Sequence, residues 1–318
     1  MDLAERIIGG DQRAAARLMR LVDDADPSAL PALAAIWRHA GRAGVIGITG
    51  SPGSGKSTLI DGLIALLRAA GHRVGVVAVD PTSPFTGGAI LGDRVRMQRH
   101  AIDAGVFIRS LATRGSLGGL SASAGTVAMI LDAIGFDRVL LETVGVGQDE
   151  VDVASHADVT VVVVPPGLGD DVQAQKAGVL EIADVLVVSK ADLPDAERTA
   201  RDLEAGVGLG PAGGRRPAVL RCSASTGQGM DALAAHIETM LADRAATGRA
   251  GEAAWQRTER LVADLVCRDL RREVERRMAS DPAVLAVLER VRLREVGPHE
   301  AAATLLERLN LSRPEAPG

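Results

Sequence analysis

The chain has 318 residues, of which 47% are hydrophobic and 24% are charged, proportions that are ordinary for a folded globular protein. The formal net charge of −5 leaves no basic excess to neutralise a nucleic acid, so we expect no such partner. No run reaches the ~18 apolar residues of a membrane span, and the N-terminus does not resemble a signal peptide. Two widely spaced cysteines predict neither a disulfide framework nor a zinc site. We therefore expect a cytoplasmic protein without a membrane partner.

The first part of the chain is predicted to be helical. Asp11 and the pair Asp26-Pro27 can each begin a helix, and Gly41 can end one. Seven short apolar runs follow, and helical stretches separate most of them. Runs that are apolar throughout suit strands covered on both faces, and their alternation with helices predicts a mainly parallel, doubly wound α/β sheet. In chain order the runs are "GVIGITG", "RVGVVAVD", "GVFIRSL", "DRVLLET", "DVTVVVVPPG", "DVLVVSKAD" and "RPAVLRCSA".

Beyond residue 243 the strand pattern stops. The stretch 252–279 carries apolar residues at helical spacing, and Asp281-Pro282 and Gly297-Pro298 can begin two further helices. We therefore predict three parts, which are a helical segment over 1–41, an α/β domain over 42–243 and a helical region over 244–318.

A phosphate-binding motif follows the first predicted strand. Residues 50–57, "GSPGSGKS", fit G-x-x-x-x-G-K-[ST], and a predicted helix begins directly after them. In such a loop backbone N–H groups surround phosphates, Lys56 can reach the β- and γ-phosphates, and Ser57 can bind Mg²⁺. A glycine-rich turn with an accidental lysine is the alternative, and it leaves the strand–helix context unexplained. The predicted nucleotide contacts are Gly50, Ser51, Pro52, Gly53, Ser54, Gly55, Lys56, Ser57 and Thr58.

Acidic residues at the ends of predicted strands provide candidates for metal binding and catalysis. Asp80 ends the second strand and Glu142 the fourth, at the edge where α/β sheets bind ligands. Asp93 lies in "ILGDRVRM" and could instead cap a helix. Mg²⁺ prefers oxygen ligands but takes few from the protein. Ser57 and these three acids are therefore the candidate metal ligands. The acids could also orient the attacking water.

The motif "ETVGVGQ", residues 142–148, continues the fourth strand. Gly145 could place its backbone N–H on the γ-phosphate, and Gln148 could position a water molecule for attack. Gln148 could equally be an exposed loop residue, and both interpretations stay open.

Two further motifs concern the base. In "SKAD", Asp192 can accept hydrogen bonds from guanine N1–H and the exocyclic amine, which adenine cannot supply, and the Lys190 stem can lie along the base. Ser189 stands where the usual motif has Asn, so one hydroxyl replaces a longer amide. In "CSAST", residues 222–226, the Ala224 N–H can donate to the guanine carbonyl, with Ser223 and Ser225 beside it. Two base-reading elements after a phosphate-binding loop favour GTP over ATP.

Taken together, these motifs resemble the methylmalonyl-CoA mutase-associated GTPases of the MeaB or ArgK type. The similarity covers about residues 40–240 and is carried by "GITGSPGSGKSTLID", "VAVDPTSPFTGGAILGDRVRM", "ETVGVGQDE", "PPGLGDDVQAQKAGVLEIADVLVVSKAD" and "SASTGQGMDAL". The resemblance implies a P-loop GTPase fold with a mainly parallel doubly wound sheet, N-terminal helices and a C-terminal helical arm that forms a homodimer. Ser189 departs from the family's usual Asn.

The resemblance also implies a function. A GTPase of this type binds GTP or GDP with Mg²⁺ near Ser57, Asp80, Asp93 and Glu142. It gates the loading of cobalamin into an adenosylcobalamin-dependent acyl-CoA mutase and protects that enzyme. Cobalamin is then reached only through the partner, with a cobalamin adenosyltransferase as a second partner. The "PGLGDD…QK" loop acts as an extra switch in the family, which here includes Asp170, Gln175 and Lys176.

Three other functions fit the sequence less well. A nickel- or other metal-insertion GTPase should carry paired Cys or His residues, whereas the six His are scattered without ligand spacing, which leaves a site at a dimer interface as the open alternative. A P-loop small-molecule kinase needs an acceptor pocket and a lid, and no lid is recognisable. A binding module with an inactive loop would not need Lys56, Ser57 and the acids, which are all present.

Overall fold

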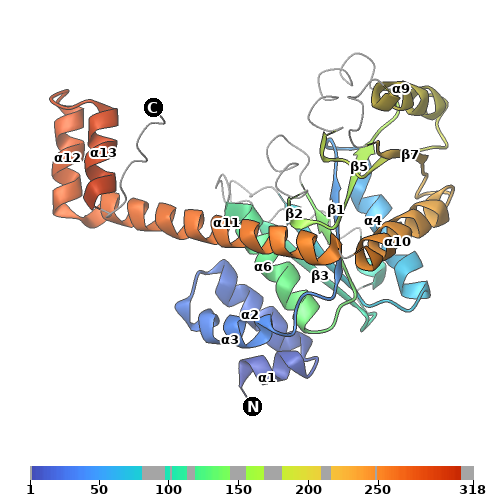
Figure 1. The fold of residues 1–318 in the computed structure, drawn as a ribbon, viewed down its shortest axis with the longest axis horizontal. Helices are drawn as coiled ribbons and strands as arrows, with labels where there is room; N and C mark the ends of the chain where they lie inside the picture. Colours follow the sequence, from blue (N-terminus) through green and yellow to red (C-terminus); the bar gives the residue numbers. More distant parts are fainter. Residues whose placement is uncertain are drawn as a thin grey trace. The chain divides into compact units, whose positions relative to one another are not determined.

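The computed structural model describes residues 2–80, 97–100, 102–112, 119–143, 155–167, 181–208, 216–247 and 249–308 (Figure 1). The chain divides into two compact units, Met1–Asp264 and Leu265–Gly318. The boundaries predicted from sequence at residues 41 and 243 stay predictions. Over the described residues, no helix combines the length and apolarity that a membrane crossing requires.

The described part of the first unit contains a seven-stranded sheet in the order β3-β2-β4-β1-β5-β6-β7, and all six strand pairs are parallel. This confirms the predicted parallel, doubly wound fold. β5 is buried at every position because both faces of the sheet are covered. The strands are β1 (Gly44–Thr49), β2 (Val74–Asp80), β3 (Val106–Ala112), β4 (Arg138–Glu142), β5 (Val159–Val164), β6 (Val185–Val188) and β7 (Ala218–Arg221).

Helices pack on both faces of the sheet (Figure 1). Neighbouring strand residues point to opposite faces, so Val45 joins the core beneath α6 while Ile46 joins the core beneath α4 and α10. Of the N-terminal helices, α2 and α3 pack on α6 and α1 packs on α2 and α3, while α9 covers β5 and β6. The helices are α1 (Leu3–Ile8), α2 (Gln12–Asp23), η1 (Pro27–Ala29), α3 (Leu30–Trp37), α4 (Lys56–Ala69), η2 (Gln98–His100), α6 (Gly119–Ala133), α9 (Ala196–Gly208) and α10 (Met230–Ala246).

The helix starts follow the local chemistry of the sequence. Asp11 accepts hydrogen bonds from the N–H groups of Arg13 and Ala14, and Asp26 accepts one from Ser28. Both caps lie where the sequence predicts them. The N-terminal helices are therefore defined locally and fixed in place by burial against α6.

The predicted C-terminal helices are α11 (Arg249–Ser280), α12 (Pro282–Arg292) and α13 (Pro298–Arg308). Asp281 caps α12, with Pro at its first position as expected. The first half of α11 is tied to the segment before β5, because His156 Nε2 lies 3.0 Å from Asp264 Oδ2 and both side chains are buried.

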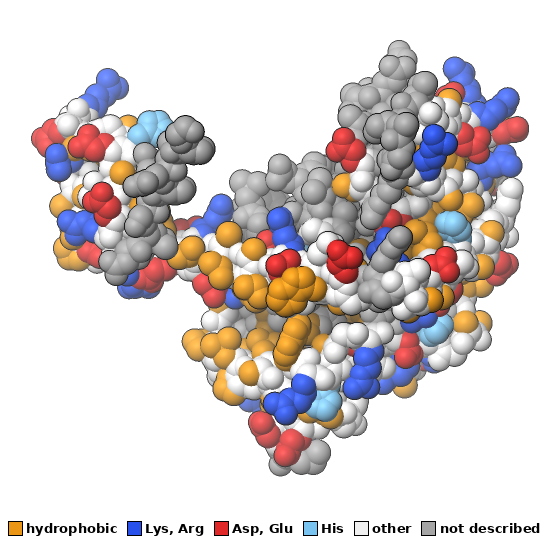
Figure 2. Space-filling model, viewed as in Figure 1, with side chains coloured by type: hydrophobic (Ala, Val, Ile, Leu, Met, Phe, Trp, Pro, Cys, Tyr) orange, Lys and Arg blue, Asp and Glu red, His pale blue; other side chains and the backbone are white. Residues whose placement is uncertain are grey.

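Large hydrophobic side chains stay exposed along α11 (Figure 2). Trp255 is 61%, Val262 54% and Val266 52% exposed. Spacings of seven and four residues place these side chains on one face of the helix. An apolar helix face of this kind is typical of a protein interface.

Candidate nucleotide-binding site

The phosphate-binding loop joins β1 to α4 and depends on two glycines. Gly50 has a φ of +138°, and a Cβ there would lie 2.1 Å from the carbonyl oxygen of Val163 on β5. Gly55 has a φ of +93° at the N-terminal cap of α4. Only glycine adopts such conformations easily, and only glycine lets the loop lie this close to β5. The loop's N–H groups and the start of α4 thereby form a site for an anion.

Lys56 and Ser57 begin α4 and are both buried. Lys56 Nζ donates to the carbonyl oxygens of Gly50, at 2.7 Å, and Ser51, at 3.1 Å. The ammonium group therefore lies across the loop, where phosphate oxygens can take the place of these carbonyls.

Ser57 Oγ donates to Glu142 Oε1 at 2.8 Å, so the first turn of α4 meets the end of β4. The ends of β1 and β4 are also joined to each other, because Thr143 Oγ1 donates to Thr49 Oγ1 at 2.9 Å. A hydroxyl and a carboxylate beside a phosphate-binding loop suit Mg²⁺, which prefers oxygen and needs few protein ligands. The described residues hold no group of three or more His, Cys, Asp or Glu side chains that could bind a metal by themselves.

Ser189 directly follows β6 and is only 4% exposed. Its hydroxyl donates to the backbone carbonyl of Ser54 at 2.6 Å, and its N–H donates to Val164 O at 2.9 Å. Ser189 thus contacts the phosphate-binding loop. Lys190 reaches the same loop, since its Nζ donates to Gly53 O at 3.2 Å.

Asp192 and the loop after β7 form the candidate base pocket. Ser223 Oγ donates to Asp192 Oδ1 at 2.5 Å and lies 3.0 Å from Ser225 Oγ. This hydrogen bond lowers the pKa of Asp192 below its usual value, because it stabilises the ionised carboxylate. The Ala191 N–H donates to Cys222 O at 3.1 Å, which joins the two loops through their backbones. An ionised carboxylate fixed in this way can accept hydrogen bonds from guanine.

An anchor that the sequence did not indicate lies beside α4. Arg99 Nε donates to Asp61 Oδ1 at 2.8 Å, and His100 Nε2 lies 3.0 Å from the same oxygen. These contacts attach η2 to α4. No local motif marks them, because Asp61 is 38 residues away from Arg99 in the sequence.

Several predicted site residues cannot be placed. Asp80 ends β2, next to β4, but its side chain is not described. The residues outside the described ranges are Asp93, Gly145, Gln148, Asp170, Gln175 and Lys176. The structure therefore brings together the phosphate-binding loop, Glu142 and the two base-reading motifs. The roles of Asp80 and of the residues outside the described ranges stay predictions.

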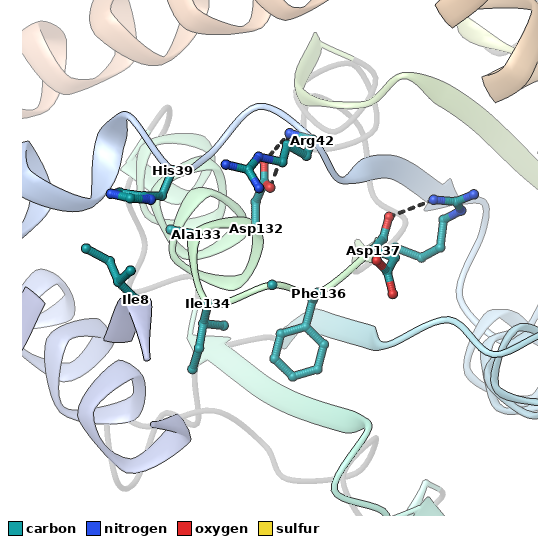
Figure 3. A pocket seen from close by; sticks show the side chains of 10 residues that line it. Ile8, His39, Arg42, Asp132, Ala133, Ile134, Phe136 and Asp137 are labelled. Atoms are coloured by element: carbon teal, nitrogen blue, oxygen red, sulfur yellow. Dashed lines mark hydrogen bonds between the residues drawn. The ribbon is translucent and has the colours of Figure 1, made fainter. Parts of the chain in front are cut away.

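A separate hollow of about 430 Å³ lies at the opposite edge of the sheet, where β4 begins and α6 ends (Figure 3). Asp132 in its wall accepts hydrogen bonds from the N–H groups of residues 41–43, and burial raises the pKa of this carboxyl. Ligands of open α/β sheets bind at the carboxyl ends of the strands, so this hollow is not part of the nucleotide site.

The parallel sheet, the phosphate-binding loop at its carboxyl edge and the adjoining SKAD and SAS loops are those of a P-loop GTPase. Comparison with known families identifies the group more closely. The model of the "Methylmalonyl Co-A mutase-associated GTPase MeaB" family matches residues 15–279, and the chain belongs to this family.

Individual relatives agree with the family. A protein of Pyrococcus horikoshii named as a GTPase is 44% identical over 312 residues, which are 97% of this chain and 98% of the other. The methylmalonic aciduria type A homolog of Mus musculus is 38% identical over 190 residues, or 58% of this chain and 46% of that protein. The crystal structure of an LAO/AO transport system kinase has a TM-score of 0.69 at 25% identity and covers 97% of this chain and 96% of that one. The similarity to the Pyrococcus protein covers nearly the whole chain, so it includes the N-terminal and C-terminal helices as well as the sheet.

Proposed function

We propose that this GTPase uses Mg²⁺-dependent GTP hydrolysis to gate cobalamin loading into an adenosylcobalamin-dependent acyl-CoA mutase and to protect that enzyme. The family description names methylmalonyl-CoA mutase as the associated enzyme, and the mouse relative is named for methylmalonic aciduria. Both names support a mutase as the partner. Cobalamin is bound by the partner rather than by this chain, and a cobalamin adenosyltransferase is the proposed donor of the cofactor.

The observation that carries the proposal is the contact between the two halves of the site. Ser189 follows β6 and belongs to the base-reading motif, yet its hydroxyl donates to Ser54 in the phosphate-binding loop at 2.6 Å. Asp192, three residues later, is held by Ser223 at 2.5 Å. The phosphate loop and the base pocket are therefore parts of one continuous site, as a guanine nucleotide requires.

We assign phosphate and Mg²⁺ binding to the residues at the start of α4 and their neighbours. Lys56 moves its hydrogen bonds from the loop carbonyls to the β- and γ-phosphates, while the loop N–H groups surround them. Ser57 and Glu142 hold Mg²⁺, together with Asp80 and Asp93. The ion supplies positive charge against the phosphate oxygens in the transition state. The 2.8 Å contact between Ser57 Oγ and Glu142 Oε1 supports this assignment, because it places two oxygen atoms of the kind that Mg²⁺ prefers next to each other.

We assign the remaining roles to residues that follow the strands. The Gly145 N–H contacts the γ-phosphate and Gln148 positions the attacking water. In the base half, Asp192 accepts from guanine N1–H and the exocyclic amine, and Ala224 N–H donates to the guanine carbonyl. Lys190 covers the base, and its 3.2 Å contact with Gly53 supports a position between base and phosphates.

A second switch is proposed within residues 165–178, "PPGLGDDVQAQKAG". Asp170, Gln175 and Lys176 report the bound nucleotide to the mutase, although Asp170 could also simply cap a helix. The coupling is reciprocal, so a mutase that binds the GTP form more tightly must also raise GTP affinity by the same factor.

The homodimer is proposed to form through α11. Trp255 at 61% exposure and Val262 at 54% leave a row of large apolar side chains uncovered on one face of this helix. Pairing with a second copy would remove that surface from water at roughly 25 cal/mol per Å². Light scattering on the full chain tests this, and a monomer at micromolar concentration would reject it.

The experiment that tests the function measures phosphate release from GTP with and without a methylmalonyl-CoA mutase. We expect slow hydrolysis by the GTPase alone, acceleration by the mutase, and no comparable reaction with ATP. Lys176→Ala should retain GTP binding but lose most of the acceleration. Equal stimulation of this variant and the wild type would remove Lys176 from the switch. A mutase without effect on the wild type would reject the partner.

A further inference from the structure

Ser189 has one hydroxyl donor, and the structure shows where it is used. The donor is directed at Ser54 O at 2.6 Å, with Val164 O as a second carbonyl at 3.4 Å. Both are backbone acceptors inside a buried part of the protein. A hydroxyl carries a single O–H, so this donor is not available to a bound base.

The neighbouring groups are also committed to the fold. The Ser189 N–H donates to Val164 O at 2.9 Å, and the side chain is 4% exposed. A Cβ placed on Gly55 would lie 3.9 Å from Ser189 Cβ, an ordinary packing distance. The serine therefore fills its position in contact with the loop and keeps its hydroxyl turned away from solvent.

The base pocket has polar groups elsewhere. Asp192 offers acceptors to N1–H and the exocyclic amine, and Ala224 N–H offers a donor to the carbonyl. Two ring acceptors of guanine remain, N3 and N7, and N7 lies beside the carbonyl and needs a donor. Resting on the function proposed above, we propose that Ser189 is a positioning residue that joins the phosphate loop to the base loop and leaves N7 of the guanine unread. The site then accepts guanine nucleotides whether position 7 is nitrogen or carbon.

This proposal separates two effects that a change at Ser189 could have. If the hydroxyl only holds the loop, its removal weakens every guanine nucleotide by the same factor. If the hydroxyl reads the base, its removal weakens GTP but not an analogue that lacks N7. A net hydrogen bond is worth about 0.5–1.5 kcal/mol, which is roughly 2-fold to 12-fold in affinity.

The test is a cycle between protein and ligand with the full chain, GTP, 7-deaza-GTP, wild type and Ser189→Ala. Dissociation constants are measured by calorimetry with Mg²⁺. We expect wild type to bind both nucleotides within about twofold, and Ser189→Ala to weaken both by the same factor, roughly 2-fold to 12-fold. Ser189→Thr, which keeps the hydroxyl, should restore most of the affinity. Thr239→Ala is the matched control, because it removes an exposed hydroxyl that donates to Ala235 O within α10.

The possible outcomes are distinct. Wild type that binds GTP more than about fivefold tighter than 7-deaza-GTP, with the difference abolished in Ser189→Ala, overturns the proposal, because a full hydrogen bond is then made to N7. A Ser189→Ala variant with unchanged affinity for both nucleotides overturns the positioning role. A wild-type chain that binds neither nucleotide overturns the proposed function and this inference with it.

Discussion

Replacing Asp192 by Asn should remove the preference for guanine. The carboxylate is held by Ser223 at 2.5 Å, which lowers its pKa and leaves its other oxygen, with the remaining lone pairs, for the base. An Asn amide keeps one acceptor and presents two donors, so one of its N–H groups would oppose the N–H groups of guanine. Asn and Asp have nearly the same shape, so the loss reports on the charge and the hydrogen bonds of the carboxylate and not on packing.

The magnitude follows from the chemistry of the contact. A hydrogen bond to a charged group is worth about 1.5–3 kcal/mol, and a buried donor left unpaired costs about 1–3 kcal/mol. We therefore expect GTP affinity to fall by roughly one to two orders of magnitude in Asp192→Asn, while the weak affinity for ATP stays the same. Xanthosine triphosphate, which has a carbonyl in place of the exocyclic amine, should bind the variant better than it binds the wild type.

Calorimetric titration of the three triphosphates, with Mg²⁺ present, measures these affinities. Because the pKa of Asp192 is lowered, its carboxylate is charged above that pKa and protonates only as the pH falls through it. Guanine preference should therefore be constant between about pH 5 and pH 8. An Asp192→Asn variant that binds GTP within about threefold of wild type would refute the assignment of this residue to the base.

Three further predictions concern other parts of the molecule. Lys56→Ala removes the ammonium that lies across the phosphate loop, so nucleotide turnover should fall by at least about two orders of magnitude in a phosphate-release assay. Unchanged turnover in this variant, or in the wild type after EDTA has removed Mg²⁺, would contradict the assignment of the nucleotide site. Burial raises the pKa of Cys222 to about 11, so at pH 8 a thiol reagent should label only the other, exposed cysteine, and labelling of both in the folded protein would disprove the burial. Asp264→Ala removes a buried carboxylate that lies 3.0 Å from His156 and should lower the free energy of unfolding by about 3 kcal/mol in urea, whereas Glu289→Ala, which breaks an exposed pair, should change it by less than about 1 kcal/mol. Equal effects of these two changes would show that burial of the pair does not matter.

The sheet and the phosphate loop could be predicted from sequence because their signals are local. Each strand is a short apolar run, and the G-x-x-x-x-G-K-[ST] motif lies within eight consecutive residues at the β1–α4 junction. The capping residues Asp11 and Asp281 also act on the next few residues of the chain. Burial on both faces then follows from the mainly apolar composition of the central strands, such as β5.

The contacts that assemble the site could not be predicted, because they join distant parts of the chain. Ser189 and Ser54 are 135 residues apart, and Ser57 and Glu142 are 85 apart. Both contacts depend on strand order, because Ser57 meets Glu142 where β4 lies beside β1, and Ser189 meets Ser54 where β5 and β6 follow on the other side of β1. The sequence predicts that Ser189 makes a weaker contact than the Asn of the usual motif. The structure shows that its shorter side chain still reaches the phosphate-binding loop at Ser54.

The most direct test of the central claim, that this chain is a guanine-specific nucleotide hydrolase with one continuous site, is the steady-state rate of phosphate release from GTP and from ATP at equal concentration with Mg²⁺. We predict measurable, slow release from GTP, almost none from ATP, and loss of the GTP reaction in Lys56→Ala. Equal release from the two nucleotides, or release from GTP that survives Lys56→Ala, would contradict it.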